Sequence, residues 1–190
     1  MQNNIQTSHR LGAILIITFI VVSIDQATKY WAWLTLRGAP TTTYLDGIIR
    51  LSFHENPGAF LSLGATLPPF WRTLIFTVLV AFFLIYLFYY LLTEQSISEI
   101  GVRFGAMMFA GGLGNLIDRI FFENGVIDFL NVGYGNLRTG VFNVADMAIM
   151  VGVFGMLFLG RAPMPDPAPQ IEDKMEKPQE ENYEYEQTEN

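Results

Sequence analysis

Four apolar segments constrain this chain more than any other feature, because each is long enough to cross a lipid bilayer. A transmembrane helix needs about 20 mostly apolar residues to span a hydrocarbon core of about 30 Å. The sequence predicts such spans at residues 11–34, 70–92, 100–122 and 141–160. Only 15% of the residues are charged, which is typical of a membrane protein and not of a soluble domain. We therefore expect an all-α polytopic membrane protein with four transmembrane helices.

The net charge of −7 comes from the C-terminal end of the chain. Residues 162–190 follow Arg161 and contain five prolines, about half of the acidic residues and only Lys174 and Lys177 among the basic ones. This composition predicts a disordered acidic tail over 161–190. The remaining body is balanced in charge, so it has no basic face for nucleic acid. The absence of cysteine excludes disulfides, thiol nucleophiles and thiolate metal sites.

Two long connections emerge on the same side of the predicted membrane domain. In residues 35–69, Thr41–Leu45, an Asp46-Gly47 turn and an alternating segment from Ile49 predict a β-hairpin. Residues 123–140 could add a further strand. Both connections follow odd-numbered spans, whereas residues 93–99 form the connection on the opposite side.

The polar side chains of the membrane domain are predicted to gather on the side of these two connections. Ionisable groups at membrane depth cost at least about 2.5–3.5 kcal/mol each on insertion scales, so a cluster of them indicates a functional site. The cluster comprises Asp25, Lys29, His54, Glu55, Asn56, Asn115, Asp118, Arg119, Asn143 and Asp146.

The pattern Asn-x-x-Asp occurs twice in this cluster, ending at Asp118 and at Asp146. Residues three apart share a helix face, so Asn115 and Asn143 can each hold the neighbouring carboxylate by a hydrogen bond. Two carboxylates that converge in a site of low dielectric constant tend to share one proton. One of them can then activate water while the other protonates a carbonyl. The pattern predicts an aspartic peptidase with Asp118 and Asp146 as its pair.

The residues alone leave other interpretations open. The acidic cluster could be the proton or cation site of a transporter, or a structural ion-pair network. In particular, Asp25 and Lys29 are predicted to form an ion pair at i, i+4. A serine triad would need His54 from a loop, and His54-Glu55 lacks the second histidine of a zinc-peptidase motif. A serine–lysine pair would need Lys29, which Ser23 does not face.

Five short motifs resemble those of bacterial lipoprotein signal peptidase, also called signal peptidase II, in the same order and spacing. The resemblance covers residues 11–160. The motifs are Asp25-Gln-Ala-Thr-Lys29, Asn56-Pro-Gly-Ala-Phe60, Gly112-Leu-Gly-Asn-Leu-Ile-Asp-Arg119, Val126-Ile-Asp-Phe129 and Phe142-Asn-Val-Ala-Asp146.

The resemblance implies an intramembrane aspartic endopeptidase that cleaves the signal peptide from a prolipoprotein, just before a cysteine that carries a diacylglyceryl group. It implies a multi-pass protein of the bacterial cytoplasmic (inner) membrane, in contact with membrane lipids. Residues 1–10 and the tail would be cytoplasmic, and the active site and a small β cradle would lie near the outer face. It also implies that no metal or cofactor is used and that globomycin-type compounds inhibit the enzyme.

The resemblance further implies roles for individual residues. Asp118 and Asp146 are expected to be the catalytic pair. The other motif residues are expected to bind substrate or support the pair, namely Asn56, Gly58, Asn115, Arg119, Asn143, Asp25, Lys29 and Asp128. The alternatives are a proton-coupled membrane transporter built on the same acidic cluster and a catalytically inactive relative.

Overall fold

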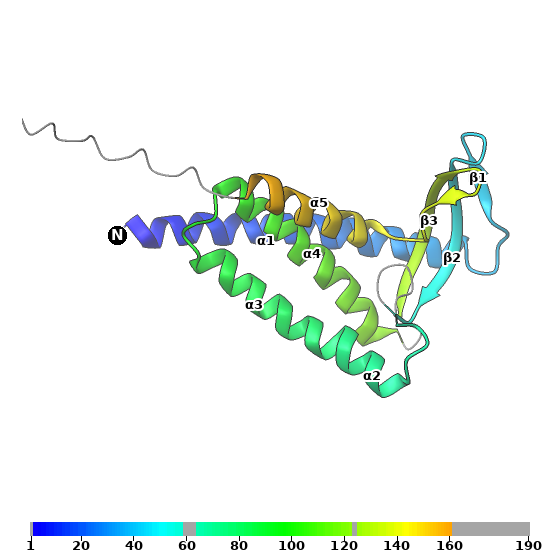
Figure 1. Ribbon diagram of the computed structural model, residues 1–190, viewed down its shortest axis with the longest axis horizontal. Coiled ribbons are helices and arrows are strands. Elements are labelled where there is room, and N and C mark those ends of the chain that lie inside the picture. The colour runs from blue at the N-terminus through cyan, green and yellow to red at the C-terminus, as the bar shows by residue number, and fades with distance from the viewer. Residues whose placement is uncertain (1, 59–63, 123–124, 161–190) are drawn as a thin grey trace, which may run out of the picture.

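A computed structural model describes residues 2–58, 64–122 and 125–160 of the chain. These residues form an elongated helical bundle with a small antiparallel sheet across one end (Figure 1). The acidic tail predicted over residues 161–190 lies outside the described residues.

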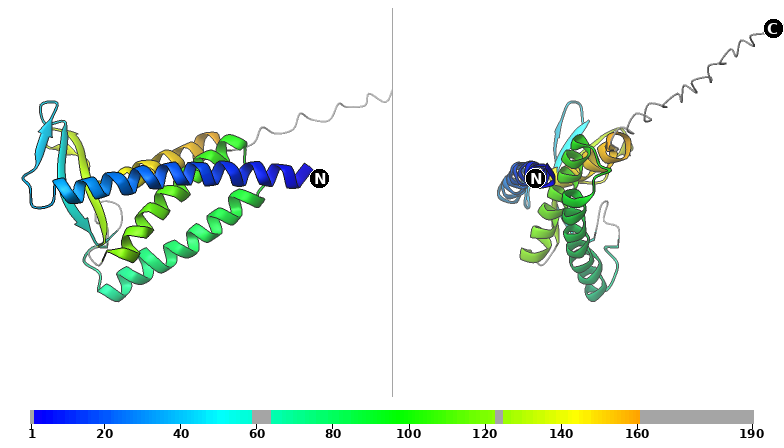
Figure 2. Two further views of the ribbon diagram at one scale, coloured as in Figure 1. Left: turned by 180° about the vertical axis from the view of Figure 1, so that it is seen from behind. Right: turned by 90° about the vertical axis from the view of Figure 1, so that its left-hand side faces the viewer.

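Helix α1 (Gln2–Thr35) runs along the length of the bundle, from the free end to the sheet (Figure 2). Its 34 residues correspond to about 51 Å of α-helix, which exceeds the thickness of a hydrocarbon core. The helix therefore begins before residue 11, the boundary that the apolar pattern gives for the first span. Its large apolar side chains, such as Phe19 and Ile16, are mostly exposed, as expected of a surface that contacts lipid.

The second apolar segment is one continuous helical stretch in three parts: α2 (Pro69–Thr73), the π-helical segment η2 (Leu74–Leu79) and α3 (Val80–Thr93). Proline fits the first helical turn because its missing N–H would have no partner there. A π-helical segment changes the direction of the side chains along a helix and often occurs at functional sites.

Helix α4 (Glu99–Phe121) is the third apolar segment, and the hydroxyl of Ser98 caps its N-terminus by accepting a hydrogen bond from the Gly101 N–H. Among the residues that the structure describes, three helical stretches are long and apolar enough to cross a membrane. They are Gln6–Thr35, Pro69–Thr93 and Glu99–Phe121.

Helix α5 (Val144–Leu159) is shorter than the fourth span predicted from the sequence. Phe142 pairs with Leu130 of the sheet, so it is not available to the helix. Asn143 then starts α5 through a capping box, in which its side chain accepts from the Asp146 N–H and the Asp146 carboxylate accepts from the Asn143 N–H. With 16 residues, α5 is about 24 Å long, below the about 30 Å of a hydrocarbon core.

The sheet contains the predicted hairpin and the second connection. Its strands are β1 (Thr42–Tyr44), β2 (Ile49–Asn56), β3 (Val126–Tyr134) and β4 (Leu137–Arg138), all antiparallel and in the order β1-β2-β3-β4. The turn between β1 and β2 places Leu45, Asp46 and Gly47 in the left-handed region, with φ of 51°, 52° and 85°. The second connection contributes two strands where the sequence indicated one.

Helices α4 and α5 pack closely because glycines face the partner backbone. A Cβ atom on Gly111 would overlap the Ala145 carbonyl oxygen, and one on Gly152 would lie 2.6 Å from the Met108 nitrogen. Gly114 faces α1, where a Cβ atom would lie 2.7 Å from a carboxylate oxygen of Asp25. This close packing brings α1, α4 and α5 together next to the sheet.

Arg10 stabilises the opposite end of the bundle. Its guanidinium is buried and donates to the Glu94 carbonyl at 2.6 Å, to the Ile97 carbonyl at 2.9 Å and to the Glu99 carboxylate at 3.2 Å. These bonds tie α1 to the connection between α3 and α4. A cation also interacts favourably with the free carbonyls at the C-terminus of α3.

Candidate active site

The predicted polar cluster lies where the helices meet the sheet. Six of its members are buried, although they come from α1, α4, the start of α5 and strand β2. These buried residues are Asp25, Lys29, Asn56, Asn115, Asp118 and Asn143, and Asp128 of β3 joins them. The cluster divides into a closed ion network and an open cavity.

The closed network consists of Asp25, Lys29 and Asp118. The Lys29 ammonium lies 2.8 Å from the Asp25 carboxylate and 3.0 Å from the Asp118 carboxylate, and it donates to the Asn115 side-chain oxygen at 2.9 Å. All three ammonium protons therefore have an acceptor. The predicted i, i+4 pair of Asp25 and Lys29 is present, and Asp118 is part of the same network.

The oxygens of Asp118 are fully engaged within this network. One accepts from the Gln26 amide at 2.9 Å, and the other accepts from Lys29 and from the Ile127 backbone N–H at 3.1 Å. The residue has no exposed surface. Asp25 is also fully buried, and it accepts from the Ala145 backbone N–H at 2.8 Å. Neither carboxylate has a free side on which to bind a water molecule and a substrate.

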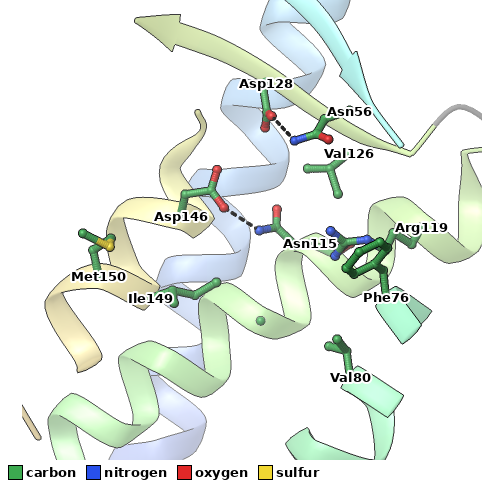
Figure 3. A pocket seen from close by; sticks show the side chains of 11 residues that line it. Asn56, Phe76, Val80, Asn115, Arg119, Val126, Asp128, Asp146, Ile149 and Met150 are labelled. Atoms are coloured by element: carbon green, nitrogen blue, oxygen red, sulfur yellow. Dashed lines mark hydrogen bonds between the residues drawn. The ribbon is translucent and has the colours of Figure 1, made fainter. Parts of the chain in front are cut away.

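Asn115 connects the ion network to Asp146. Its side-chain oxygen accepts from Lys29 and from the Asn143 amide at 3.1 Å, so its nitrogen must point the other way. That nitrogen donates to the Asp146 carboxylate at 2.8 Å (Figure 3). Lys29 therefore fixes the amide orientation that holds Asp146, without touching Asp146 itself.

Asp128 of β3 is held from two sides. The Asn56 amide donates to one carboxylate oxygen at 2.9 Å, and the Asn143 amide donates to the other at 2.7 Å. Burial raises the pKa of Asp128 to about 7, and the nearby Asp146 carboxyl adds to this rise, while the two amides oppose it. Asn143 also donates its backbone N–H to Asp146 at 3.2 Å, so it contacts both acids.

An open cavity of about 350 Å³ lies between the sheet end of α4, α5 and the second helical stretch. Figure 3 shows Asp128 entering it from the sheet side and Asp146 from α5. The lining residues are Asn56, Phe76, Val80, Gly112, Asn115, Arg119, Val126, Asp128, Asp146, Ile149 and Met150. The cavity therefore has a polar end with two carboxyls and an apolar remainder.

Arg119 forms one edge of the cavity. It donates to the Gly58 carbonyl at 2.8 Å and to the Asn115 carbonyl at 3.3 Å, and its guanidinium lies over the Phe76 ring, 6.0 Å from the centroid. The Gly58 N–H in turn donates to the Asn56 side-chain oxygen at 3.0 Å. Gly58 thus links the end of β2 to both Arg119 and the amide that holds Asp128.

The structure assigns different places to the two aspartates that the sequence paired. Asp146 lines the cavity, whereas Asp118 does not, because it is sealed in the ion network with Lys29. Asp128, which the family resemblance implies to be a supporting residue, faces the cavity together with Asp146. The geometry therefore argues against Asp118 as the partner of Asp146 and favours Asp128.

Two contributors were not recognised in the sequence. Gln26 donates to Asp118 and to Asp25, and its position inside the Asp25–Lys29 motif was the available signal. Phe76 lines the cavity from the π-helical segment, and no pattern in an apolar span marks such a residue. Within the described ranges, no three histidine, aspartate or glutamate side chains are grouped so that they could hold a metal ion.

The fold and the site define a class: a membrane protein with a carboxyl-lined, partly apolar cavity at one end of a helical bundle. Residues 17–160 match the family described as Signal peptidase (SPase) II. The chain belongs to this family. It is therefore a peptidase of the membrane and not a transporter.

Individual relatives agree with this assignment. The chain is 31% identical to the lipoprotein signal peptidase of Borrelia hermsii over 79% of its own length and 89% of the relative. It is 34% identical to the lipoprotein signal peptidase of Syntrophus aciditrophicus over 73% of the chain and 86% of the relative. A bacterial membrane enzyme solved in meso at 2.3 Å resolution superposes with a TM-score of 0.67 at 26% identity, over 77% of this chain and 85% of that chain.

Proposed function

We propose that this protein cleaves signal peptides from diacylglyceryl-modified prolipoproteins, just before the lipidated cysteine, and that Asp128 and Asp146 form its catalytic pair. One observation carries the assignment of the pair: these two carboxyls line the same cavity, whereas every oxygen of Asp118 is occupied inside a closed network. Family membership supports the reaction, and the geometry supports the residues.

The two carboxyls are suited to act on one water molecule. With a pKa of about 7, Asp128 carries the shared proton near neutral pH, while Asp146 is ionised and held by Asn115 and Asn143. The ionised carboxylate of Asp146 takes a proton from water, and the oxygen of that water molecule attacks the scissile carbonyl carbon. The protonated carboxyl of Asp128 donates to the carbonyl oxygen. The C–N bond then breaks as the cysteine amine takes the proton that Asp146 received from water, and the new carboxyl group of the product returns a proton to Asp128.

The apolar surfaces around Asp146 support a substrate with two apolar parts. The first cavity is lined on one side by Phe76 and Val80 and on the other by Ile149 and Met150. A second, mostly apolar cavity of about 310 Å³ lies along α5 and shares Asp146 and Met150 with the first. A signal helix and acyl chains can therefore both reach the carboxyl from the bilayer. Globomycin-type inhibitors are expected to occupy the same cavity and to compete with substrate.

The membrane arrangement is part of the proposal. We infer that α5 is a fourth, short span, so that the chain crosses the bacterial inner membrane four times. The bilayer can thin around a short helix at a modest cost. The sheet and the active site would then lie at the outer face, with residues 1–10 and the tail in the cytoplasm.

Cleavage of a purified, diacylglyceryl-modified prolipoprotein by the detergent-solubilised protein tests the pair. The variants Asp128→Asn and Asp146→Asn are expected to lose at least about 10³-fold in rate, since each removes a group that must gain or lose a proton. Asp118→Asn is the matched variant, because it is the same chemical change in a residue outside the cavity. A gel shift of the lipidated product gives the rate.

The dependence of the cleavage rate on pH separates a structural role of Asp118 from a catalytic one. Asp118→Asn weakens the ion network, so its rate and its thermal stability are expected to fall together, with the wild-type pH profile retained. If Asp118→Asn is folded yet inert while Asp128→Asn keeps near-normal cleavage, the catalytic pair is Asp118 and Asp146 after all.

A further inference from the structure

A small polar cavity of about 130 Å³ lies beside the active site, between α2, η2 and the end of α4. It shares Phe76 and Arg119 with the active-site cavity but contains neither catalytic carboxyl. Arg72 of α2 lines it from the other side, and the neighbouring Thr73 and Thr77 add hydroxyl groups. Two arginines from separate helical elements thus face one space.

Arg72 has no acceptor in the part of the chain that the structure describes. Its guanidinium makes no hydrogen bond and no ion pair there, although the side chain is half-buried. A partly desolvated guanidinium without an anion is unfavourable, because it loses hydration without gaining a partner. The vacant donors of Arg72 therefore point to a ligand from outside the protein.

Arg119 is incompletely satisfied as well. Its two terminal nitrogens donate to backbone carbonyls, but its Nε is buried and has no hydrogen-bond partner. The Phe76 ring beneath the guanidinium limits its freedom to turn away. A buried donor without an acceptor is uncommon in folded proteins and calls for an explanation. An anion in the adjoining cavity would explain the unpaired donor, because it can accept a hydrogen bond.

The charge and depth of the cavity specify the anion. None of its described lining residues is acidic, and two planar guanidinium groups suit the paired oxygens of a phosphate ester. Phe70 and Trp71, beside Arg72, are 69% and 51% exposed and lie at the start of a candidate span, which is typical of the aromatic belt at a membrane interface. The cavity thus lies at the depth of lipid headgroups.

We propose that the cavity between Arg72 and Arg119 binds the phosphodiester group of a membrane phospholipid. The diacylglyceryl substrate has no phosphate, so the occupant is a separate lipid molecule. Its phosphate would brace Arg119 and Phe76 at the edge of the active-site cavity. The proposal goes beyond cleavage and requires only that the chain is embedded in a bilayer.

Lipid binding to the full-length protein in neutral detergent tests the proposal by native mass spectrometry. The probes are dioleoyl phosphatidylglycerol, dioleoylglycerol, which has the same chains without phosphate, and inorganic phosphate. We expect one phosphatidylglycerol to bind and Arg72→Gln to weaken it about tenfold, as expected for a charge-assisted hydrogen bond. Arg103→Gln is the matched control, an exposed arginine at the other end of α4, and is expected to change binding less than about twofold, as for other surface charges.

The same measurement can overturn the site. If dioleoylglycerol binds as tightly, the acyl chains and not the phosphate are recognised. If inorganic phosphate competes at equal concentration, the ligand is a free anion. If Arg72→Gln and Arg103→Gln weaken binding alike, the effect comes from general surface charge. Arg72→Lys keeps the charge without the planar fork and is expected to bind with intermediate affinity. None of these outcomes depends on cleavage, so they leave the catalytic assignment independently testable.

Discussion

The proton on Asp128 links the geometry of the site to a pH dependence. Burial in β3 raises the pKa of this carboxyl to about 7, so the proton is lost as the pH rises through that value. If the pair needs one shared proton, the single-turnover cleavage rate is expected to be highest below about pH 7 and to fall about tenfold per pH unit well above it. Measurement of cleavage from pH 5 to 9 checks this.

The control for the pH profile is reversibility. Protein held at pH 9 and returned to pH 6 should recover its full rate, which excludes unfolding as the cause of the decline. A rate that stays constant up to pH 9 would mean that neither carboxyl needs its proton, and would contradict the shared-proton mechanism.

Asn115 provides a second test at the scale of single residues, because its amide orientation is set by Lys29. In Asn115→Asp, the new carboxylate can still accept from Lys29 and Asn143, but it presents an oxygen to Asp146 where an N–H was. Loss of this donor is expected to reduce the cleavage rate about 10²-fold, with the fold retained.

Asn131→Asp is the matched control for this substitution. Asn131 lies in the sheet, where its side-chain oxygen accepts from Arg138 Nε at 2.6 Å and its nitrogen donates to the Thr139 carbonyl at 2.6 Å. The substitution therefore adds the same charge and removes an amide donor, but outside the cavity. We expect its rate to stay within about twofold of wild type, as for most surface changes. Equal loss in both variants would show that added negative charge, and not the lost donor, slows the reaction.

The sequence located most of the residues that gather at the site, whereas its pairing of Asp118 with Asp146 stays a prediction that the geometry does not favour. Asp118 and Asp146 share the Asn-x-x-Asp pattern, which favours them as equals. The pattern cannot show that Lys29, four residues after Asp25, also reaches Asp118 and closes it off. Nor can it show that β3 turns Asp128 toward α5, since the register between a strand and a helix is a tertiary property.

At the scale of elements, the α4–α5 contact is the packing that holds Asp146 near Asn115. Gly111→Ala would drive a Cβ atom against the Ala145 carbonyl and within 2.8 Å of an Ile149 side-chain carbon. Since backbone cannot move aside cheaply, we expect a loss of about 1–3 kcal/mol in stability. Thermal unfolding in detergent, followed by tryptophan fluorescence, measures it.

Gly12→Ala is the control, because it is the same change in another helix. A Cβ atom on Gly12 would meet nothing within 4 Å. Alanine is the better helix former, so stability is expected to stay equal or rise by up to about 1 kcal/mol. If Gly111→Ala also leaves the unfolding temperature unchanged, the α4–α5 interface is looser than the structure indicates.

The spans were the most predictable elements, and their ends the least. Uninterrupted apolar length predicts a helix in a bilayer, because backbone groups can be satisfied there only within the helix or a closed sheet. The start of α5 instead depends on Phe142 pairing with Leu130 and on the capping box of Asn143. The first of these contacts joins segments that a local pattern does not relate.

At the scale of the whole molecule, the four crossings that we propose would place the sheet on one side of the membrane and both termini on the other. The chain has no cysteine, so single cysteines can report the topology directly. Thr43→Cys lies in β1, Gln95→Cys lies in the connection between α3 and α4, and both positions are exposed. A cysteine appended after Asn190 reports the C-terminal end.

A membrane-impermeant maleimide applied to spheroplasts is expected to label Thr43→Cys and to label the other two only after lysis. Since α5 is the short helix, the appended cysteine decides the fourth crossing: if it is labelled in intact spheroplasts while Gln95→Cys is not, α5 does not cross. Label at Gln95→Cys but not at Thr43→Cys would invert the orientation and place the active site in the cytoplasm. Asp128 lies in the sheet, so only a pattern in which Thr43→Cys is labelled places the Asp128–Asp146 pair at the outer face, where we propose that it meets its substrate.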